Sequence, residues 1–231
     1  MKVLALDTST MWGIIGISDD GVPLAEIGIK SYSPYSKILM EGIDFLLRQV
    51  GLKIDDIEGV GVGIGPGSFT GLRVGISTII GIAYAKGLLV APIPSLEAIA
   101  MNLTPTNNLI CPIIDAKKKE IFSGLFRYKN EEKLYRIEEE RSWKPSELAE
   151  KIKDKVLFTG SGITKYGQFF KETLNEKAAF VSKRFWFPRG SILAIMAERM
   201  IQLGEGVKPH LIKPIYGRAS DAELSLNGNK E

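Results

Sequence analysis

Residues 59–75 read GVGVGIGPGSFTGLRVG and predict a strand, a sharp turn and a helix in succession. The apolar run with alternating glycines over residues 59–64 predicts a buried strand. Gly65-Pro66-Gly67 predicts a sharp turn with room for a close backbone approach. A helix follows, which the hydroxyl of Ser68 or Thr70 would cap by accepting a backbone N–H.

The helix after this turn carries no charge over residues 74–85, VGISTIIGIAYA. A helix that is apolar all round is buried on both sides, and this apolar segment is too short to cross a membrane. We expect one face to pack on the protein's own sheet and the other on a second protein. Gly71, Gly75 and Thr78 follow one another at helical spacing, with Ile82 next, which favours a close backbone contact. Packing against the protein's own sheet explains the same spacing and stays the alternative.

Composition sets loose limits on function. The chain has 231 residues and a net charge of +3, which is too small to indicate nucleic-acid binding by itself. Cys111 is the only cysteine, so no intramolecular disulfide can form, as is typical of a reducing compartment. The start MKVLALDTST lacks the long apolar region of a secretory signal. We expect a cytoplasmic protein without membrane attachment.

Both halves of the chain open with an apolar strand that ends in an aspartate. Residues 3–6 lead into Asp7, and residues 109–114 lead into Asp115. In the first half, strands joined by hairpins precede helices that alternate with parallel-type strands. This order predicts a mixed sheet with helices on its faces.

The same patterns divide the chain into two α/β lobes. We assign residues 1–107 to the first lobe, 108–207 to the second, and 208–231 to a tail that returns toward the first lobe and has a loose end. Within the first lobe, residues 36–50 predict a helix with Leu39, Ile43 and Leu46 on one stripe.

Five short blocks spread over the chain carry a family resemblance. They are LALDTST at 4–10, GIGPGSFTGLRVG at 63–75, PIPSLEAIA at 92–100, DAKKKEIF at 115–122 and PIYGR at 214–218. Together they resemble the TsaB (YeaZ) family, whose older label is glycoprotease-like peptidase. The resemblance implies a two-lobed actin/Hsp70/sugar-kinase-like fold with a ribonuclease H-like motif. It also implies a non-catalytic partner of a TsaD-type enzyme, in the threonylcarbamoylation of adenosine 37 of tRNAs that read codons beginning with A.

The resemblance further implies where the partners bind. The helix at 36–50 and the helix after Ser68 would form the surface for TsaD, and for a homodimer when TsaD is absent. A TsaE-type ATPase would join the assembly, and tRNA would be reached only through the complex. The implied interface residues are Leu39, Ile43, Leu46, Gly71, Gly75, Thr78 and Ile82.

Catalytic chemistry finds little support in the sequence. TsaD-type enzymes bind a metal through the two histidines of a His-Leu-Glu-Gly-His block, where this chain has SLEAI at 95–99. His210 is the only histidine, so neither a two-histidine metal site nor a convincing Ser68–His210 peptidase can be built. We expect no catalytic and no metal-binding residue. The main alternative is an ATP-dependent small-molecule kinase of the same superfamily, and a metal-independent peptidase comes last.

Nucleotide binding is a weaker prediction. Asp7, Thr8 and Ser9 resemble a first phosphate loop, with a carboxylate for magnesium and hydroxyls for phosphate. Gly160 and Gly162 would let an adenosine lie against the backbone. The other interpretation is that Asp7 caps the amides of its neighbours. We expect no tightly bound cofactor, and at most weak ATP or ADP with Mg²⁺ at the cleft or at the partner interface.

Two basic segments suggest contact with RNA. One is Lys117–Lys119. In the other, Lys183, Arg184 and Arg189 flank the aromatic residues 185–187, and proteins often hold single-stranded RNA by such a combination. Burial of the aromatic segment before Pro188 is the alternative interpretation.

Overall fold

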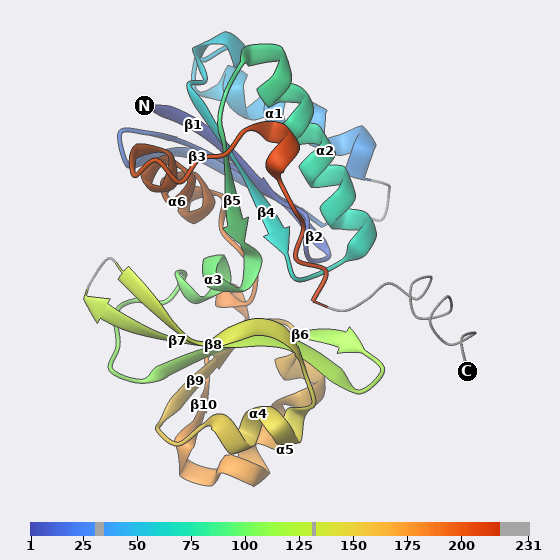
Figure 1. Ribbon diagram of the computed structural model, residues 1–231, viewed down its shortest axis with the longest axis vertical. Coiled ribbons are helices and arrows are strands. Elements are labelled where there is room, and N and C mark those ends of the chain that lie inside the picture. The colour runs from blue at the N-terminus through green and yellow to red at the C-terminus, as the bar shows by residue number, and fades with distance from the viewer. Residues whose placement is uncertain (31–34, 131–132, 218–231) are drawn as a thin grey trace.

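The computed structural model describes residues 1–30, 35–130 and 133–217, and its strands form two five-stranded sheets. Each sheet is the centre of one lobe, and the two lobes lie one above the other in Figure 1. In the described part of the chain, no helix is long and apolar enough to span a membrane.

The first sheet has the order β3-β2-β1-β4-β5. Its strands β1, β2 and β3 are antiparallel neighbours, whereas β4 runs parallel to β1 and β5 runs parallel to β4. The strands are β1 (Lys2–Asp7), β2 (Trp12–Asp19), β3 (Val22–Lys30), β4 (Gly59–Gly65) and β5 (Val90–Pro94).

The second sheet repeats this topology. Read from its β8 edge, the order is β8-β7-β6-β9-β10, with three antiparallel strands followed by two parallel ones. The prediction of two related mixed-sheet lobes, and with it the actin/Hsp70/sugar-kinase-like fold class, is confirmed. The strands are β6 (Leu109–Lys117), β7 (Glu120–Asn130), β8 (Lys133–Trp143), β9 (Val156–Thr159) and β10 (Ala178–Phe180).

Helices cover both faces of the first sheet because successive strand residues point to opposite sides. Leu4 and Leu6 of β1 belong to the core that includes α1 (Tyr35–Gln49) and α2 (Phe69–Lys86). Val3 and Ala5 pack with α6 (Gly190–Gln202) on the other face. In Figure 1, α6 and the α1/α2 pair accordingly flank the strands of the upper lobe.

The position of α6 differs from the sequence-based division. Residues 190–202 lie within the segment 108–207 that we assigned to the second lobe, yet α6 packs across the strands of the first sheet. The physical reason is the apolar face of Val3, Ala5 and Ile14, which needs a cover. The chain then stays with the first lobe, where the Ile215 N–H donates to the Ile64 carbonyl at 2.7 Å, and it reaches the second lobe at Gly217, whose carbonyl accepts from the Ser142 N–H of β8 at 3.2 Å. The tail beyond residue 217 lies outside the described residues.

Two helices that the sequence patterns did not predict complete the architecture. The short α3 (Ser95–Ala100) contacts strands of both lobes, and α5 (Ile163–Leu174) packs on the second sheet beside α4 (Pro145–Lys151). Single turns of 3-10 helix are η1 (Ile54–Asp56), η2 (Asn175–Lys177), η3 (Lys183–Phe185) and η4 (Pro209–Leu211). The predicted cap of α2 is confirmed at Ser68, whose hydroxyl accepts from the Gly71 N–H at 3.2 Å.

Candidate functional site

Asp7, the first residue of the predicted phosphate loop, ends β1 with a completely buried carboxylate. Its Oδ1 accepts from the backbone N–H and the hydroxyl of Ser9 at 2.7 and 2.6 Å, and Oδ2 accepts from the Ser95 hydroxyl at 2.5 Å. Burial raises the pKa of Asp7, against the lowering effect of the serine hydrogen bonds. Because both oxygens have internal donors, the geometry fits a capping role for Asp7 better than a magnesium ligand.

The SLEAI block at 95–99 contains Ser95, the hydrogen-bond donor to Asp7 Oδ2. The Ser95 hydroxyl, besides donating to Asp7, accepts from the Gly65 N–H at 3.1 Å, and Ile99 is completely buried. The two positions at which TsaD-type enzymes carry metal ligands therefore serve internal bonding and packing here. Across the residues that the structure describes, no group of three His, Cys, Asp or Glu side chains could hold a metal.

Thr8 joins β1 to the glycine face of α2. Its hydroxyl donates to the Gly71 carbonyl at 2.7 Å. A Cβ atom at Gly71 would lie 2.0 Å from the Thr8 carbonyl oxygen, and one at Gly75 would lie 2.2 Å from Thr8 Oγ1. The prediction that Gly71 and Gly75 receive a partner helix is wrong, because the end of β1 already occupies that face.

The apolar members of the predicted interface are also internal. Leu39, Ile43, Leu46 and Ile82 are buried in the core beneath α1 and α2. The apolar stripe of an amphipathic helix is the one that faces its own core, which is why this selection was wrong. Thr78, half-buried, is the predicted interface residue that reaches the surface, and its hydroxyl donates to the Val74 carbonyl at 2.9 Å.

The outer faces of α1 and α2 nevertheless expose apolar side chains. Met40 and Phe45 of α1 are 52% and 47% exposed, and Tyr84 of α2 is 57% exposed. Between the helices lies a groove of about 590 Å³, which we call the α1/α2 groove. At Gly81 a Cβ atom would meet nothing within 4 Å, so this glycine leaves the groove open. The residues lining the groove are Met40, Ile54, Asp55, Ser77, Thr78, Gly81, Ile82, Ala85 and Lys86.

Gly160 and Gly162 belong to the second lobe and approach its backbone closely. A Cβ atom at Gly160 would lie 2.3 Å from the Ile113 carbonyl oxygen, and the Gly162 N–H donates to that oxygen at 2.9 Å. Both glycines thus allow the loop after β9 to pack on β6. The structure brings Asp7, Thr8 and Ser9 together, while the contacts of the two glycines are with Ile113.

The aspartate of the second lobe is held by lysines. Asp115 accepts from the Lys117 N–H at 3.0 Å and from Lys165 Nζ at 3.2 and 3.3 Å. Burial alone would raise the pKa of Asp115, but these two lysines hold it below its usual value. Lys117, Lys118 and Lys119 all adopt left-handed backbone angles, with φ of 64°, 47° and 65°. The turn therefore carries lysines at the position where the two-lobed ATPases have a glycine-containing loop that binds phosphate.

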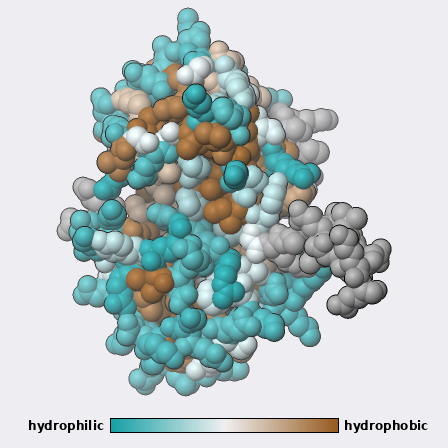
Figure 2. All heavy atoms as spheres, in the orientation of Figure 1, coloured by the Kyte–Doolittle hydropathy of each residue, from teal (hydrophilic) through white to brown (hydrophobic). Residues whose placement is uncertain are grey.

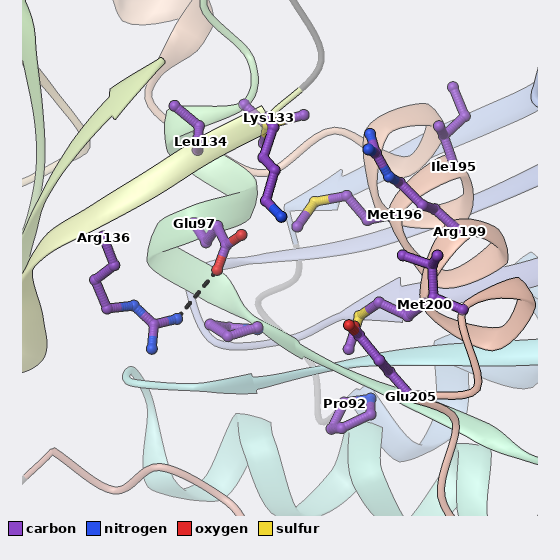
Figure 3. A pocket seen from close by; sticks show the side chains of 13 residues that line it. Pro92, Glu97, Lys133, Leu134, Arg136, Ile195, Met196, Arg199, Met200 and Glu205 are labelled. Carbon is purple, nitrogen blue, oxygen red and sulfur yellow. Dashed lines mark hydrogen bonds and ion pairs between the residues drawn. The ribbon is translucent and has the colours of Figure 1, made fainter. Parts of the chain in front are cut away.

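A pocket of about 350 Å³ lies between α3, β8 and α6, and we call it the interlobe pocket. In Figure 3, Arg136 of β8 and Glu97 of α3 point toward each other, with Nη2 and Oε2 3.1 Å apart. Glu140 Oε1 lies 3.1 Å from the same Nη2, and burial raises the pKa of Glu140 to about 8. Sequence reasoning missed this pocket because its walls come from segments far apart in the chain.

The surface of the two lobes differs in character. Figure 2 shows apolar side chains gathered on the first lobe in this view, whereas the second lobe is covered largely by hydrophilic ones. Exposed apolar residues of the first lobe also include Leu203 and Leu211, at 65% and 53% exposure. Apolar contact surface is therefore a property mainly of the first lobe.

Comparison with known proteins gives one consistent result. Residues 31–225 match the family described as TsaD, tRNA N6-adenosine threonylcarbamoyltransferase. The chain is 28% identical over 226 residues to the tRNA threonylcarbamoyladenosine biosynthesis protein TsaB of Bacillus subtilis, covering 96% of each chain. It is 30% identical over 185 residues to the TsaB protein of Haemophilus influenzae, covering 75% of this chain and 78% of that one. The solved structure of YeaZ from Pseudomonas aeruginosa superposes with a TM-score of 0.80 at 22% identity, covering 93% of this chain and 99% of that one.

Proposed function

The chain belongs to the TsaB (YeaZ) family, with a role in tRNA threonylcarbamoyladenosine biosynthesis, and on this premise we propose that it is the non-catalytic partner of a TsaD-type enzyme. The observation that carries the proposal is the bonding of Ser95. Its hydroxyl stands at a metal-ligand position of the catalytic relatives and joins Asp7 to Gly65 at 2.5 and 3.1 Å. A side chain used in this way supports the fold and leaves the reaction to another chain.

The α1/α2 groove is the surface that we propose for the partner. Its walls expose Met40 on one helix, and Gly81 on the other leaves space for a close backbone approach. Large exposed apolar side chains around a groove are typical of protein interfaces. The proposal replaces the buried residues predicted from the sequence with the exposed ones of the same two helices, and retains Thr78.

Other parts of the expected assembly stay predictions. We propose that the same groove supports a homodimer when the TsaD-type partner is absent, that a TsaE-type ATPase joins the complex, and that the assembly is cytoplasmic. Weak ATP or ADP binding also stays a prediction. Its magnesium component fits poorly, because Ser9 and Ser95 already donate to both oxygens of Asp7.

Size-exclusion chromatography with light scattering tests the partner role. The wild-type chain, mixed with the TsaD-type protein of the same cell, should elute as a 1:1 complex. Gly81→Arg should prevent this complex while leaving the chain folded, because a Cβ atom at this position meets no other atom within 4 Å. The matched control is Thr173→Arg, which adds the same charge on an exposed helical position of the second lobe.

Three results would contradict the proposal. Assembly of Gly81→Arg to the same extent as wild type would place the interface elsewhere. If the wild-type chain formed no complex with the TsaD-type protein, the proposed partner role would be wrong. Threonylcarbamoyl transfer to tRNA by this chain alone would show that it is itself the enzyme.

A further inference from the structure

A third hollow lies at the edge of the first sheet, where the chain after η3 crosses β2 and β3. We call it the edge pocket, and its volume is about 510 Å³. One wall consists of Trp12 and Phe187, and the rim carries Lys183, Arg184 and Arg189. The pocket therefore joins a segment that the sequence singled out, residues 183–189, to an aromatic side chain from the start of β2.

The aromatic wall has an accessible face. The rings of Trp12 and Phe187 lie with centroids 5.8 Å apart and planes inclined by 51°, and both residues are half-buried. A Cβ atom at Gly28 of β3 would lie 3.6 Å from Cε3 of Trp12, so a larger residue there would cover part of this ring. By contrast, Trp186 is buried and its indole N–H donates to the Val181 carbonyl at 3.1 Å. The neighbouring aromatic Trp186 thus supports the loop and leaves Trp12 and Phe187 to form the wall.

The rim carries excess positive charge. Lys183 and Arg184 are exposed, and each lies over an aromatic ring. Lys183 Nζ is 5.8 Å from the centre of the Trp186 ring, and Arg184 Cζ is 5.1 Å from the centre of the Phe185 ring. Arg189 pairs with Glu26, with 3.1 Å between Nε and Oε1. Glu26 is the single carboxylate among the lining residues, so three cations face one anion.

The carboxylate of Glu26 is already engaged at the start of α6. It accepts from the N–H and hydroxyl of Ser191 at 2.9 and 2.6 Å. Burial alone would raise the pKa of Glu26, but the bonds from Arg189 and Ser191 hold it below its usual value. Glu26 therefore stays ionised at neutral pH and fixes Arg189 at the rim.

We propose that the edge pocket binds one unstacked nucleotide of a single-stranded RNA segment. The base would stack on the Trp12 ring and touch the inclined Phe187 ring with its edge, and the adjoining phosphates would lie among Lys183, Arg184 and Arg189. Aromatic stacking beside cationic side chains is how proteins hold single-stranded nucleic acid. The proposal rests on the proposed function only in taking tRNA as the source of the RNA, and it adds a direct contact to the indirect one that the family resemblance implies.

The location suits such a contact. Trp12 packs with the α6 side of the first sheet, whereas α1 and α2 cover the opposite side (Figure 1). A partner docked in the α1/α2 groove would therefore leave the edge pocket accessible. RNA and partner could be held at the same time by opposite faces of one lobe.

Fluorescence anisotropy tests the proposal with a labelled single-stranded RNA of about 12 nucleotides, a length within the range that single-strand binding folds cover. The affinity should fall with salt on a double-logarithmic slope of about −2, since three phosphate contacts release about 0.7 counterion each. The double variant Lys183→Glu/Arg184→Glu should lose at least about tenfold in affinity, in line with two lost contacts. The control Lys171→Glu/Lys177→Glu makes the same charge change at exposed second-lobe positions and should stay near wild type.

Stacking needs a separate readout. Trp12→Ala should weaken single-strand binding by roughly 5- to 100-fold, whereas Trp12→Phe should retain most of it and lose the tryptophan quenching caused by the base. A duplex of the same sequence should bind more weakly than the single strand, because its bases are already stacked. Circular dichroism melting of each variant confirms that the chain is folded.

The possible failures are distinguishable. Equal binding of duplex and single strand, or equal loss in the control variant, would show charge attraction alone and overturn the proposal. Saturable binding of AMP without binding of RNA would make the pocket a free-nucleotide site and overturn it too. The edge variants should still form the 1:1 complex with the TsaD-type protein. The two proposals can therefore fail separately: the chain could form the complex without binding RNA, or bind RNA without forming the complex.

Discussion

Replacing Gly71 by alanine tests the contact that fixes α2 on the first sheet. The added Cβ atom would lie 2.0 Å from the Thr8 carbonyl oxygen, which is more than 1 Å inside an ordinary carbon–oxygen contact. Backbone cannot rotate away as a long side chain does, so α2 or the end of β1 must shift. The shift would also strain the hydrogen bond from the Thr8 hydroxyl to the Gly71 carbonyl, now 2.7 Å long.

The expected change in the free energy of unfolding combines two destabilising effects and one stabilising effect. Overpacking of a filled interior costs about 1–3 kcal/mol. A disrupted buried hydrogen bond costs a further 1–3 kcal/mol or so. Alanine favours the helix over glycine by about 1 kcal/mol. We therefore expect Gly71→Ala to lower the free energy of unfolding by about 2–4 kcal/mol, which corresponds to a fall in Tm of roughly 5–15 °C for a chain of this size.

Urea denaturation followed by circular dichroism measures the change, and Gly81→Ala is the matched control in the same helix. Nothing lies within 4 Å of a Cβ atom at Gly81, so only the helix preference remains and stability should rise by about 1 kcal/mol. Opposite signs for the two variants are the expected result. If Gly71→Ala were as stable as wild type, the close contact with Thr8 would not exist, and Gly71 would again be available to a partner.

Two further predictions concern buried polar groups. Burial raises the pKa of Glu140 to about 8 from an ordinary value of 4.5, so between these pH values the folded chain binds more protons than the unfolded chain. The free energy of unfolding should therefore fall as pH rises from 5 to 8, by up to roughly 4 kcal/mol. Glu140→Gln should flatten this dependence in denaturation measured at both pH values, and an unchanged slope would assign it to other groups. Ser95→Ala should cost about 2–4 kcal/mol of unfolding free energy, since it leaves the Gly65 N–H and an Asp7 oxygen without their partner. A fully stable Ser95→Ala protein would show that this hydroxyl is free for another role.

The local elements followed closely from the sequence because their signals are local. The apolar run at residues 59–64 predicted β4, the helical stripe at 36–50 predicted α1 to within one residue at each end, and the turn at residues 65–67 placed the start of α2. α3 was missed because it is a single short segment, SLEAIA, without a full helical period. Its helical state depends on packing between the two lobes, which no window of sequence contains.

The candidate sites were predicted less well than the elements. The spacing of Gly71 and Gly75 correctly indicated a close backbone contact, but not whether the contact was with β1 or with another chain. Apolar stripes identify the face that leaves water, and the core uses that face first. The exposed residues Met40, Phe45 and Tyr84 carry no periodic signal of their own, so only their 47–57% exposure separates them from the core.

The family, the two-lobed mixed-sheet fold and the lack of histidines for a metal site follow from the sequence, because they depend on motifs, strand patterns and residue types along the chain. Which polar and apolar groups are already engaged is visible only in the folded protein. In the folded protein Ser95 donates a hydrogen bond to Asp7, α6 packs on the first sheet, and Trp12 lies beside Phe187. Each of these contacts joins residues far apart in the chain, and their pairing depends on burial and directed hydrogen bonds that exist only once both lobes are assembled.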